Sequence, residues 1–179
     1  MDRHLDGFES VMCRLTATTK REAIIETIDS CPVFSIMPDI QKFKRAVLRR
    51  EEIETTGIGH GIAVAHGKVR NLSYTLVGLG ISDSGIEYNA KDGNPVHFLF
   101  VIASSPSRQL EYIKTISNIL RTLRNEEVRQ ELQKLKRNCS WSDVHSPECQ
   151  SLLQMLITQH FAWMNQPGRQ NSTENDQTQ

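Results

Sequence analysis

The chain has 179 residues, enough for one domain with an appendage and a sizeable hydrophobic core. Lysine plus arginine and aspartate plus glutamate each number 21, so the formal net charge is zero, which argues against general binding to nucleic acid or to acidic membranes. No apolar run approaches the roughly 18 to 20 residues of a membrane span, and the N-terminus MDRHLDGF is too polar for a signal peptide. We therefore expect a cytoplasmic protein without membrane insertion.

Cysteine usage agrees with a cytoplasmic location. The four cysteines are widely spread and form no C-x-x-C pair; they are Cys13, Cys31, Cys139 and Cys149. We expect reduced thiols, not a disulfide framework or a zinc site.

The first third of the chain contains one strand pattern and two helix patterns. A strand is expected at residues 11–15. Thr19 and Glu22 form a capping-box pattern before a helical run that ends at Cys31. A second helix is expected at residues 40–50, where apolar residues recur at helical spacing, and it leads directly into a glycine-rich segment.

Strand patterns dominate the middle of the chain. Strands are expected at residues 62–65, 74–79, 86–88 and 96–103, with turns at 82–85 and 92–95. The last of these strands, VHFLFVIA, is nearly all apolar, which predicts a central position in the sheet. His97 within it is expected to be a packed or hydrogen-bonded histidine.

Two further helices complete the expected domain. Ser105 and Pro106 supply an N-cap and a first-turn proline for a helix, and Asn125 begins another. The apolar stripe of the first is expected to consist of Leu110, Ile113, Ile116, Leu120 and Leu123. Tyr112 lies off this stripe and could face a cleft. These elements predict an α/β fold with a mixed central sheet flanked by helices on both faces, and with an extra C-terminal helix.

The C-terminal part has a different character. We divide the chain into a domain at residues 1–137, a helical extension at 138–165 and a disordered tail at 166–179. The apolar face of the extension is formed by Leu152, Leu153, Leu156, Ile157, His160 and Trp163. This face would pack onto its own domain, pair with a second subunit in a homodimer, or bind a target.

The most informative segment runs from Arg50 to Lys68 and reads REEIETTGIGHGIAVAHGK. It places His66 at the end of a buried strand, among glycines that allow turns and close approaches of the backbone. Gly67 is expected to leave room beside the imidazole for a tetrahedral anion. Spacing alone is compatible with a hydrogen-bonded structural histidine as well as with a histidine that carries phosphate.

The whole segment resembles the signature of the fructose-type enzyme IIA domains of the bacterial phosphoenolpyruvate phosphotransferase system, usually close to R-E-x-x-x-S-T-G-I-G-N-G-I-A-I-P-H-G-K. The matching residues are Arg50, Glu51, Thr56, Gly57, Ile58, Gly59, Gly61, Ile62, Ala63, His66, Gly67 and Lys68. The chain is most similar to the nitrogen-regulatory subclass, free-standing domains that signal rather than transport. The resemblance extends over about residues 11–137.

The resemblance implies that His66 accepts a phosphoryl group from a histidine phosphocarrier protein of the HPr type. A largely neutral imidazole has a lone pair for in-line attack on phosphorus, and no metal or other cofactor is expected. Phosphoryl transfer is stabilised by positioning and charge, so Arg50 is expected to act as a catalytic cation. The implied phosphate-binding residues are Thr56, Gly57, Gly59, Gly67 and Lys68. Without the resemblance, Arg50 and Lys68 would be ordinary surface residues.

Three positions depart from the family signature. Ala65 replaces the usual proline, which would loosen the placement of the imidazole. Tyr112 stands where the family carries a second active-site histidine; its phenol could orient His66 or touch a phosphate oxygen, or it could be an ordinary helix residue. His60 replaces an asparagine and is expected to be a loop histidine facing solvent, although it could partly replace the second histidine.

The favoured function is a nitrogen-regulatory enzyme IIA whose phosphorylation state determines which partner proteins it binds, with targets that the sequence does not identify. One alternative is a IIA subunit that passes phosphate to a separate IIB component of a sugar permease. The chain contains no fused IIB or membrane segment, which favours the regulatory version. Another alternative is a binding-only regulator that has lost efficient phosphotransfer through the changes at Ala65 and Tyr112.

Overall fold

The apolar strand β5 (Val96–Ser104) lies in the middle of the sheet, as its sequence predicts. The computed structural model describes residues 12–73 and 75–138. β5 pairs antiparallel with β4 (Leu76–Ile86) on one side and parallel with β3 (Ile62–Lys68) on the other.

Two shorter strands form the edges of the sheet. β1 (Met12–Leu15) runs parallel to β4, and β2 (Gly57–Gly59) runs antiparallel to β3. Within the described part of the chain the sheet thus has five strands in the order β1-β4-β5-β3-β2. The mixed sheet that the sequence predicts is confirmed.

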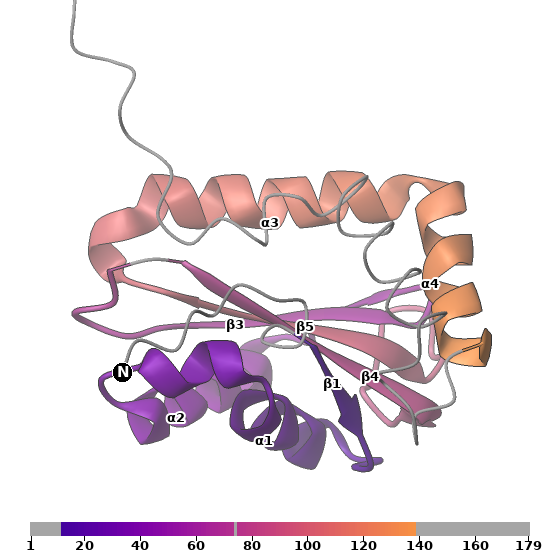
Figure 1. The fold of residues 1–179 in the computed structure, drawn as a ribbon, viewed down its shortest axis with the longest axis horizontal. Helices are drawn as coiled ribbons and strands as arrows, with labels where there is room; N and C mark the ends of the chain where they lie inside the picture. Colours follow the sequence, from indigo (N-terminus) through magenta and orange to yellow (C-terminus); the bar gives the residue numbers. More distant parts are fainter. Residues whose placement is uncertain (1–11, 74, 139–179) are drawn as a thin grey trace, which may run out of the picture.

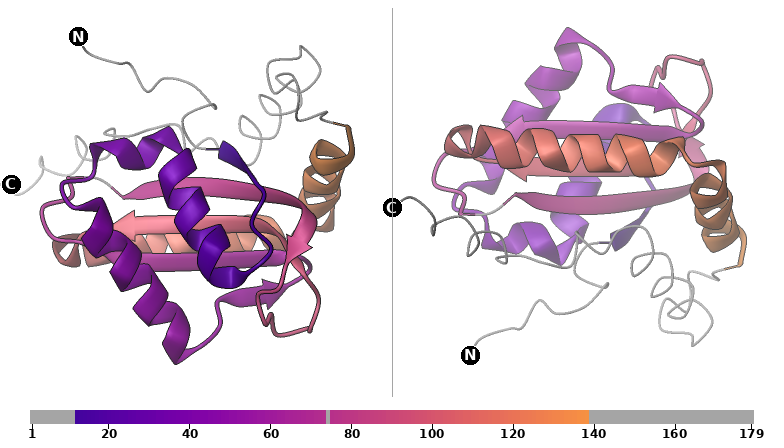
Figure 2. Two further views of the ribbon diagram at one scale, coloured as in Figure 1. Left: turned by 90° about the horizontal axis from the view of Figure 1, so that it is seen from below. Right: turned by 90° about the horizontal axis from the view of Figure 1, so that it is seen from above.

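Helices cover both faces of this sheet (Figure 1). α1 (Lys20–Ser30) and α2 (Ile40–Ile53) lie on one face and are joined through the 3₁₀ turn η2 (Pro32–Ile36). α3 (Gln109–Arg124) lies along the other face, and α4 (Glu126–Asn138) follows it at one end of the sheet. Figure 2 shows the two faces separately, with α1 and α2 in the left view and α3 in the right view.

Alternation along β3 decides which of its residues reach which face. Ala65 packs in the core under α1 and α2, whereas Val64 packs in the core under α3. Successive side chains of a strand point to opposite faces. His66 therefore lies on the α3 face, and Gly67 lies on the α2 face. The strand continues to Lys68, so His66 lies within β3 and not at its end as expected.

α2 also runs further than its sequence pattern indicates, ending at Ile53 instead of near residue 50. Asp39 caps its first turn, because its carboxylate accepts a hydrogen bond of 2.9 Å from the backbone N–H of Lys42. The longer helix places Arg50 and Glu51 within its last turn. Both side chains are thus held on a helix instead of a loop.

The expected turn at residues 82–85 is wrong, because β4 continues through it. Gly85 has a φ of +90°, and its N–H donates to Ser82 Oγ at 3.0 Å. The register against β5 shifts between Ile81 and Ile86, so these residues form an irregularity of the β-bulge type. Bulges and turns favour the same small and polar residues, and the local sequence does not distinguish between them.

The buried face of α3 includes Ile116, Leu120 and Leu123 of the expected stripe, but not the two residues nearest the start of the helix. Leu110 is 69% exposed and Ile113 is 49% exposed, whereas Tyr112, Ile119 and Leu123 are buried against the sheet. These three buried residues share one face because helical positions seven and four apart lie on the same side. Tyr112 is consequently part of the core-facing side, which corrects the expectation that it lies off the stripe.

Several expectations concern parts of the chain outside the described residues: the helical extension after Asn138, the tail at 166–179, and two of the four cysteines. The Sγ of Cys31 donates a hydrogen bond of 3.3 Å to the Sγ of Cys13. Among residues 12–73 and 75–138, no helix is long and apolar enough to cross a membrane, and no group of three or more potential ligands is arranged around a metal position.

Candidate functional site

His66 is a half-buried residue of β3 whose ring is held by its own strand. Its Nδ1 lies 3.0 Å from the carbonyl oxygen of Val64. A carbonyl oxygen only accepts hydrogen bonds, so this contact requires the proton on Nδ1 and leaves the lone pair on Nε2. The arrangement gives the imidazole a nucleophilic nitrogen directed away from its anchor.

The surroundings keep this imidazole neutral. Burial lowers the pKa of His66 below its ordinary value, and the positive charges of Arg50 and Lys68 act in the same direction. The hydrogen bond to Val64 and the negative charge of Glu51 oppose this shift without reversing it. Near neutral pH the ring is therefore neutral, with its one proton on Nδ1 and the lone pair of Nε2 available.

Tyr112 reaches the histidine from the first turns of α3. The centroids of the two rings lie 5.7 Å apart, with an angle of 59° between the ring planes. Tyr112 is 9% exposed, and burial raises the pKa of its phenol, so the side chain stays neutral. The structure thus places Tyr112 beside His66, the neighbour that the resemblance implied, but on the core-facing side of α3 and not off its apolar stripe.

Lys68 lies on the same face of β3, two residues after His66. Its Nζ lies 5.2 Å from the centroid of the Tyr112 ring and donates a hydrogen bond to Oε1 of Gln109 at the start of α3. A cation at this distance over an aromatic face is attracted to it. These contacts hold one positive charge between β3 and α3, next to the histidine.

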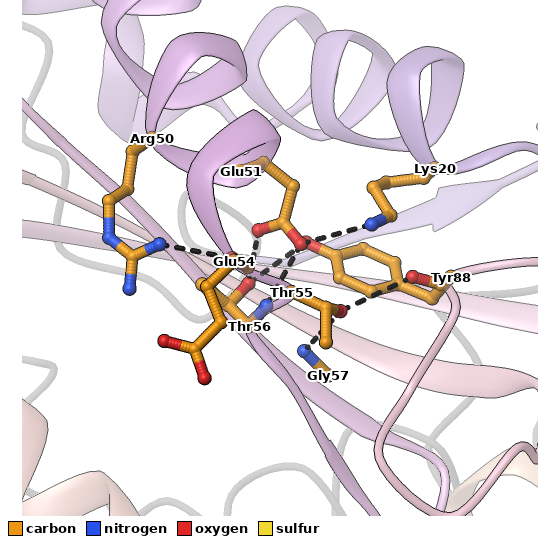
Figure 3. Close-up of polar contacts among 8 residues, drawn as sticks. All are labelled: Lys20, Arg50, Glu51, Glu54, Thr55, Thr56, Gly57 and Tyr88. Atoms are coloured by element: carbon orange, nitrogen blue, oxygen red, sulfur yellow. Dashed lines mark hydrogen bonds and ion pairs between the residues drawn. The ribbon is translucent and has the colours of Figure 1, made fainter.

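Arg50 approaches from the other face of the sheet, at the last turn of α2. Its Nη1 donates a hydrogen bond of 3.0 Å to the backbone carbonyl of Glu54 (Figure 3). The positive charge of Arg50 adds to the lowering of the pKa of His66 by burial, and it partly offsets the rise that burial causes in the pKa of Tyr112.

Thr56 is buried and already engaged with other protein groups. Its hydroxyl lies 2.5 Å from Oε2 of Glu51 and 3.1 Å from the hydroxyl of Tyr88, and its backbone N–H donates to Oε1 of Glu51 at 2.9 Å. Lys20 completes the group, with its Nζ 3.2 Å from Glu51. No site role is predicted from the sequence for Glu51, Tyr88 or Lys20, although Glu51 is one of the residues that match the signature.

The glycines of the segment serve close packing of the backbone. A Cβ on Gly57 would lie 2.8 Å from Cα of Ala90, and Gly59 has a φ of +98° that L side chains rarely adopt. A Cβ on Gly67 would lie 2.8 Å from Cγ2 of Val47 in α2. Gly67 therefore leaves room for α2, on the face opposite the imidazole, and the expected space for an anion beside the ring is not what it provides.

The other two histidines of the described residues, His60 and His97, make contacts elsewhere in the fold. His60 is exposed in the turn between β2 and β3, with a φ of +56°, and its N–H donates to Asp92 at 2.8 Å. His97 places Nδ1 2.9 Å from the carbonyl oxygen of Ser82, so it is the hydrogen-bonded strand histidine that the sequence predicts.

The described contacts thus bring together the imidazole of His66, the phenol of Tyr112 and the Lys68 cation, while Thr56, Gly57 and Gly59 contact Glu51 and the segment from Tyr88 to Asp92. Residues 8–140 match the protein family described as "Phosphoenolpyruvate-dependent sugar phosphotransferase system, EIIA 2". The chain belongs to this EIIA family.

Individual relatives carry both regulatory and sugar-transport names. A nitrogen regulatory protein of Bradyrhizobium diazoefficiens is 25% identical over 125 residues, which is 70% of this chain and 81% of the relative. A fructose-specific EIIA component of Haloferax volcanii is 30% identical over 126 residues, which is 70% of this chain and 82% of the relative. The fructose-specific EIIABC component of Bacillus subtilis is 29% identical over 123 residues, 69% of this chain, but the match spans only 19% of that longer protein.

A solved structure supports the fold assignment. The nitrogen regulatory protein IIA-Ntr from Neisseria meningitidis superposes with a TM-score of 0.57 at 17% identity, covering 69% of this chain and 84% of the other. At this identity the likeness concerns the fold alone. The EIIA relationship is therefore established by sequence, and the α/β architecture by structure.

Proposed function

We propose that the chain is a nitrogen-regulatory type enzyme IIA that is phosphorylated on Nε2 of His66 and regulates partner proteins according to its phosphorylation state. The donor in this proposal is an HPr-type phosphocarrier protein that itself carries a phosphohistidine. The protein acts in the cytoplasm, and its output is the choice of partner.

The hydrogen bond between His66 and Val64 is the observation on which the proposal rests. Because Nδ1 donates to a carbonyl oxygen 3.0 Å away, Nε2 is free to attack phosphorus. The Nε2–P bond forms as the P–N bond of the donor breaks, and the donor ring keeps the electron pair of that bond. No proton has to leave His66, and the Val64 carbonyl stabilises the positive charge that develops on its ring.

Two cations support the same step. Arg50 and Lys68 lower the pKa of His66, which keeps its lone pair available before transfer. After transfer, the same charges favour the phosphoryl group, since an electrostatic contribution is largest where charge accumulates in a partly buried site. Thr56, Gly57, Gly59 and Gly67 support the site mainly by shaping the backbone around it.

Regulation would follow from the charge that the phosphoryl group adds. A phosphoryl group brings a charge of about −2 to a surface next to Tyr112 and Lys68. Such a change favours a partner with complementary charge and disfavours a partner that packs against the neutral site. The targets are proteins, and neither a metal nor an organic cofactor takes part in the proposal.

The first experiment is an intact-mass measurement after incubation with phosphoenolpyruvate, enzyme I and the phosphocarrier protein. We expect one phosphoryl adduct that is labile in acid and absent from His66→Ala. His97→Ala is the matched control, because His97 is also a half-buried strand histidine whose Nδ1 faces a carbonyl oxygen. An adduct that persists in His66→Ala, or no adduct with a verified donor system, would contradict the proposal.

A sugar-transport role is the second candidate, because a relative of similar length carries the name of a fructose-specific EIIA component. In this version phosphorylated His66 donates to a separate IIB component. Rapid loss of the phosphoryl group to a purified IIB protein would favour it over the regulatory proposal. A third candidate, a binding-only regulator, is supported by the tyrosine beside His66 and would show partner binding without any adduct.

A further inference from the structure

Glu51 is a nearly buried carboxylate in the last turn of α2, and the phosphoryl-transfer scheme above gives it no part. Its side chain is 3% exposed. A buried carboxylate is costly unless several donors satisfy it. Here it accepts from the backbone N–H and the hydroxyl of Thr56, and it forms an ion pair with Lys20 at 3.2 Å.

The first consequence of these bonds concerns Arg50. Figure 3 shows the side chains of Arg50 and Glu51 leaving adjacent positions of α2 in different directions, Glu51 toward Thr56 and Lys20, Arg50 toward the backbone of Glu54. Glu51 ties the end of α2 to Thr56, and the intervening carbonyl of Glu54 accepts the 3.0 Å hydrogen bond from Arg50. The same short loop therefore positions the guanidinium.

The second consequence concerns the histidine itself. The carbonyl of Thr56 accepts a hydrogen bond of 3.1 Å from the N–H of Val64, and the carbonyl of Val64 holds Nδ1 of His66 at 3.0 Å. A continuous series of hydrogen bonds thus links the Glu51 carboxylate, through Thr56 and Val64, to the imidazole. In each hydrogen bond of the series, the donor belongs to the residue nearer His66 in the series and the acceptor to the residue nearer Glu51.

We propose that Glu51 is a positioning residue of the phosphorylation site: its buried carboxylate anchors Thr56, and through Thr56 it sets both the guanidinium of Arg50 and the ring of His66. This inference rests on the proposed function. Two further residues stabilise this arrangement. The hydroxyl of Tyr88 lies 3.1 Å from Oγ1 of Thr56, and Lys20 forms the ion pair with the Glu51 carboxylate. Glu51 itself does not contact the reacting atoms.

The chain contains a close control for this role. Glu26 in α1 also accepts hydrogen bonds from a threonine N–H and a threonine hydroxyl, those of Thr16, at 3.0 and 2.9 Å. These contacts adjoin β1, which is at the opposite edge of the sheet from β2. Glu26→Gln therefore removes a similar set of interactions without touching the series that leads to His66.

The test compares Glu51→Gln and Glu26→Gln by the initial rate of phosphorylation and by ¹⁵N NMR of the His66 ring. The amide places an N–H₂ donor where the carboxylate accepted, so Thr56 loses part of its anchor. A displacement of about 1 Å at a reacting group can reduce a rate about a hundredfold. We expect Glu51→Gln to slow phosphorylation at least tenfold, and Glu26→Gln to stay within about twofold of the wild type.

The NMR readout separates positioning from general loss of stability. We expect Glu51→Gln to change the Nδ1 and Nε2 resonances and the titration midpoint of His66, and Glu26→Gln to leave them unchanged. Equal rates and ring resonances in Glu51→Gln and the wild type would overturn the proposal. So would equal effects of both variants. If Glu51→Gln does not fold, Thr56→Val replaces it, because valine keeps the volume and the backbone N–H and removes only the hydroxyl.

Failure of the proposed function is distinguishable from failure of this inference. A wild-type protein that takes up no phosphoryl group contradicts phosphorylation of His66. The ring resonances of the unphosphorylated protein still decide whether Glu51 positions the imidazole, because the comparison with Glu26→Gln needs no phosphoryl donor.

Discussion

The rings of His66 and Tyr112 pack against each other between β3 and α3, with their centroids 5.7 Å apart and their planes inclined at 59°. The contact joins the proposed nucleophile to the position at which related proteins are expected to carry a second histidine. A phenol there can pack against the imidazole and under the Lys68 cation, but it cannot become a cation near neutral pH. The pair therefore contains one of the three positions at which the sequence departs from the family signature.

Substitutions at Tyr112 distinguish the contribution of its aromatic ring to the phosphorylation rate from that of its hydroxyl. Tyr112→Phe keeps the contacts of the ring with His66 and Lys68, so we expect phosphorylation within about threefold of the wild type if packing is its main task. Tyr112→His adds a group that can be protonated, and we expect it to raise the transfer rate. Stopped-flow or quenched-flow phosphorylation measures both. An unchanged rate in Tyr112→His would show that this position does not limit transfer.

The pKa of His66 determines how folding stability depends on pH. Burial lowers this pKa below 6.5 in the folded protein, so the unfolded chain binds the proton first as the pH falls. The contribution of His66 to stability is therefore fully present above about pH 6.5 and is lost as the pH falls toward the folded-state pKa. Urea unfolding between pH 5 and 8 should show a weaker pH dependence in His66→Gln, and an identical dependence would contradict the lowered pKa.

The charge of Lys68 provides a direct check on the same pKa. Lys68→Met keeps an unbranched side chain and removes a cation that lowers the pKa of His66. We expect the NMR titration midpoint of His66 to rise. Lys134→Met is a suitable control, since Lys134 lies in α4 and pairs with Glu131. A midpoint that rises equally in both variants would indicate a nonspecific effect of net charge.

Arg50 should matter for transfer and little for folding. Its side chain makes one described hydrogen bond, to the carbonyl of Glu54, so Arg50→Met should change the free energy of unfolding by less than about 1 kcal/mol. Loss of a cation that stabilises the transferring group should reduce the phosphorylation rate about tenfold to a thousandfold. Arg50→Lys should recover only part of the rate, because an ammonium does not reproduce the guanidinium geometry. Full recovery would show that charge alone is sufficient.

Gly67 is predicted to be a packing position. A Cβ there would lie 2.8 Å from Cγ2 and 3.0 Å from N of Val47, so Gly67→Ala should destabilise the protein by about 1 to 3 kcal/mol by forcing α2 away from β3. Val47→Ala in the same chain should restore part of this loss in a double-mutant cycle, because it removes the Cγ2 contact. Purely additive effects of the two substitutions, measured by urea unfolding, would contradict a direct clash.

Local sequence patterns predicted the order of the elements and the central strand well. β5 is apolar on both faces and its central position follows from that. The patterns failed where a residue's partner lies far away in the chain. The bulge near Gly85 contains turn-forming residues but continues a strand, because β5 pairs with it on both sides of the irregularity. The expected stripe of α3 is confirmed for Ile116, Leu120 and Leu123, but it is wrong for Leu110 and Ile113, because helix docking buries Tyr112 instead.

The sequence by itself determined the family, the nucleophile candidate and the adjacent basic residues, because these lie within one segment whose residue types and spacing are diagnostic. Only the tertiary structure decided that Tyr112 faces His66, that Gly67 faces α2, and that Glu51 is buried with Thr56 and Lys20. The physical reason is that a sequence pattern reports local backbone conformation and the period of burial. Contacts between residues distant in the chain depend on strand pairing and helix docking, which only the folded arrangement specifies.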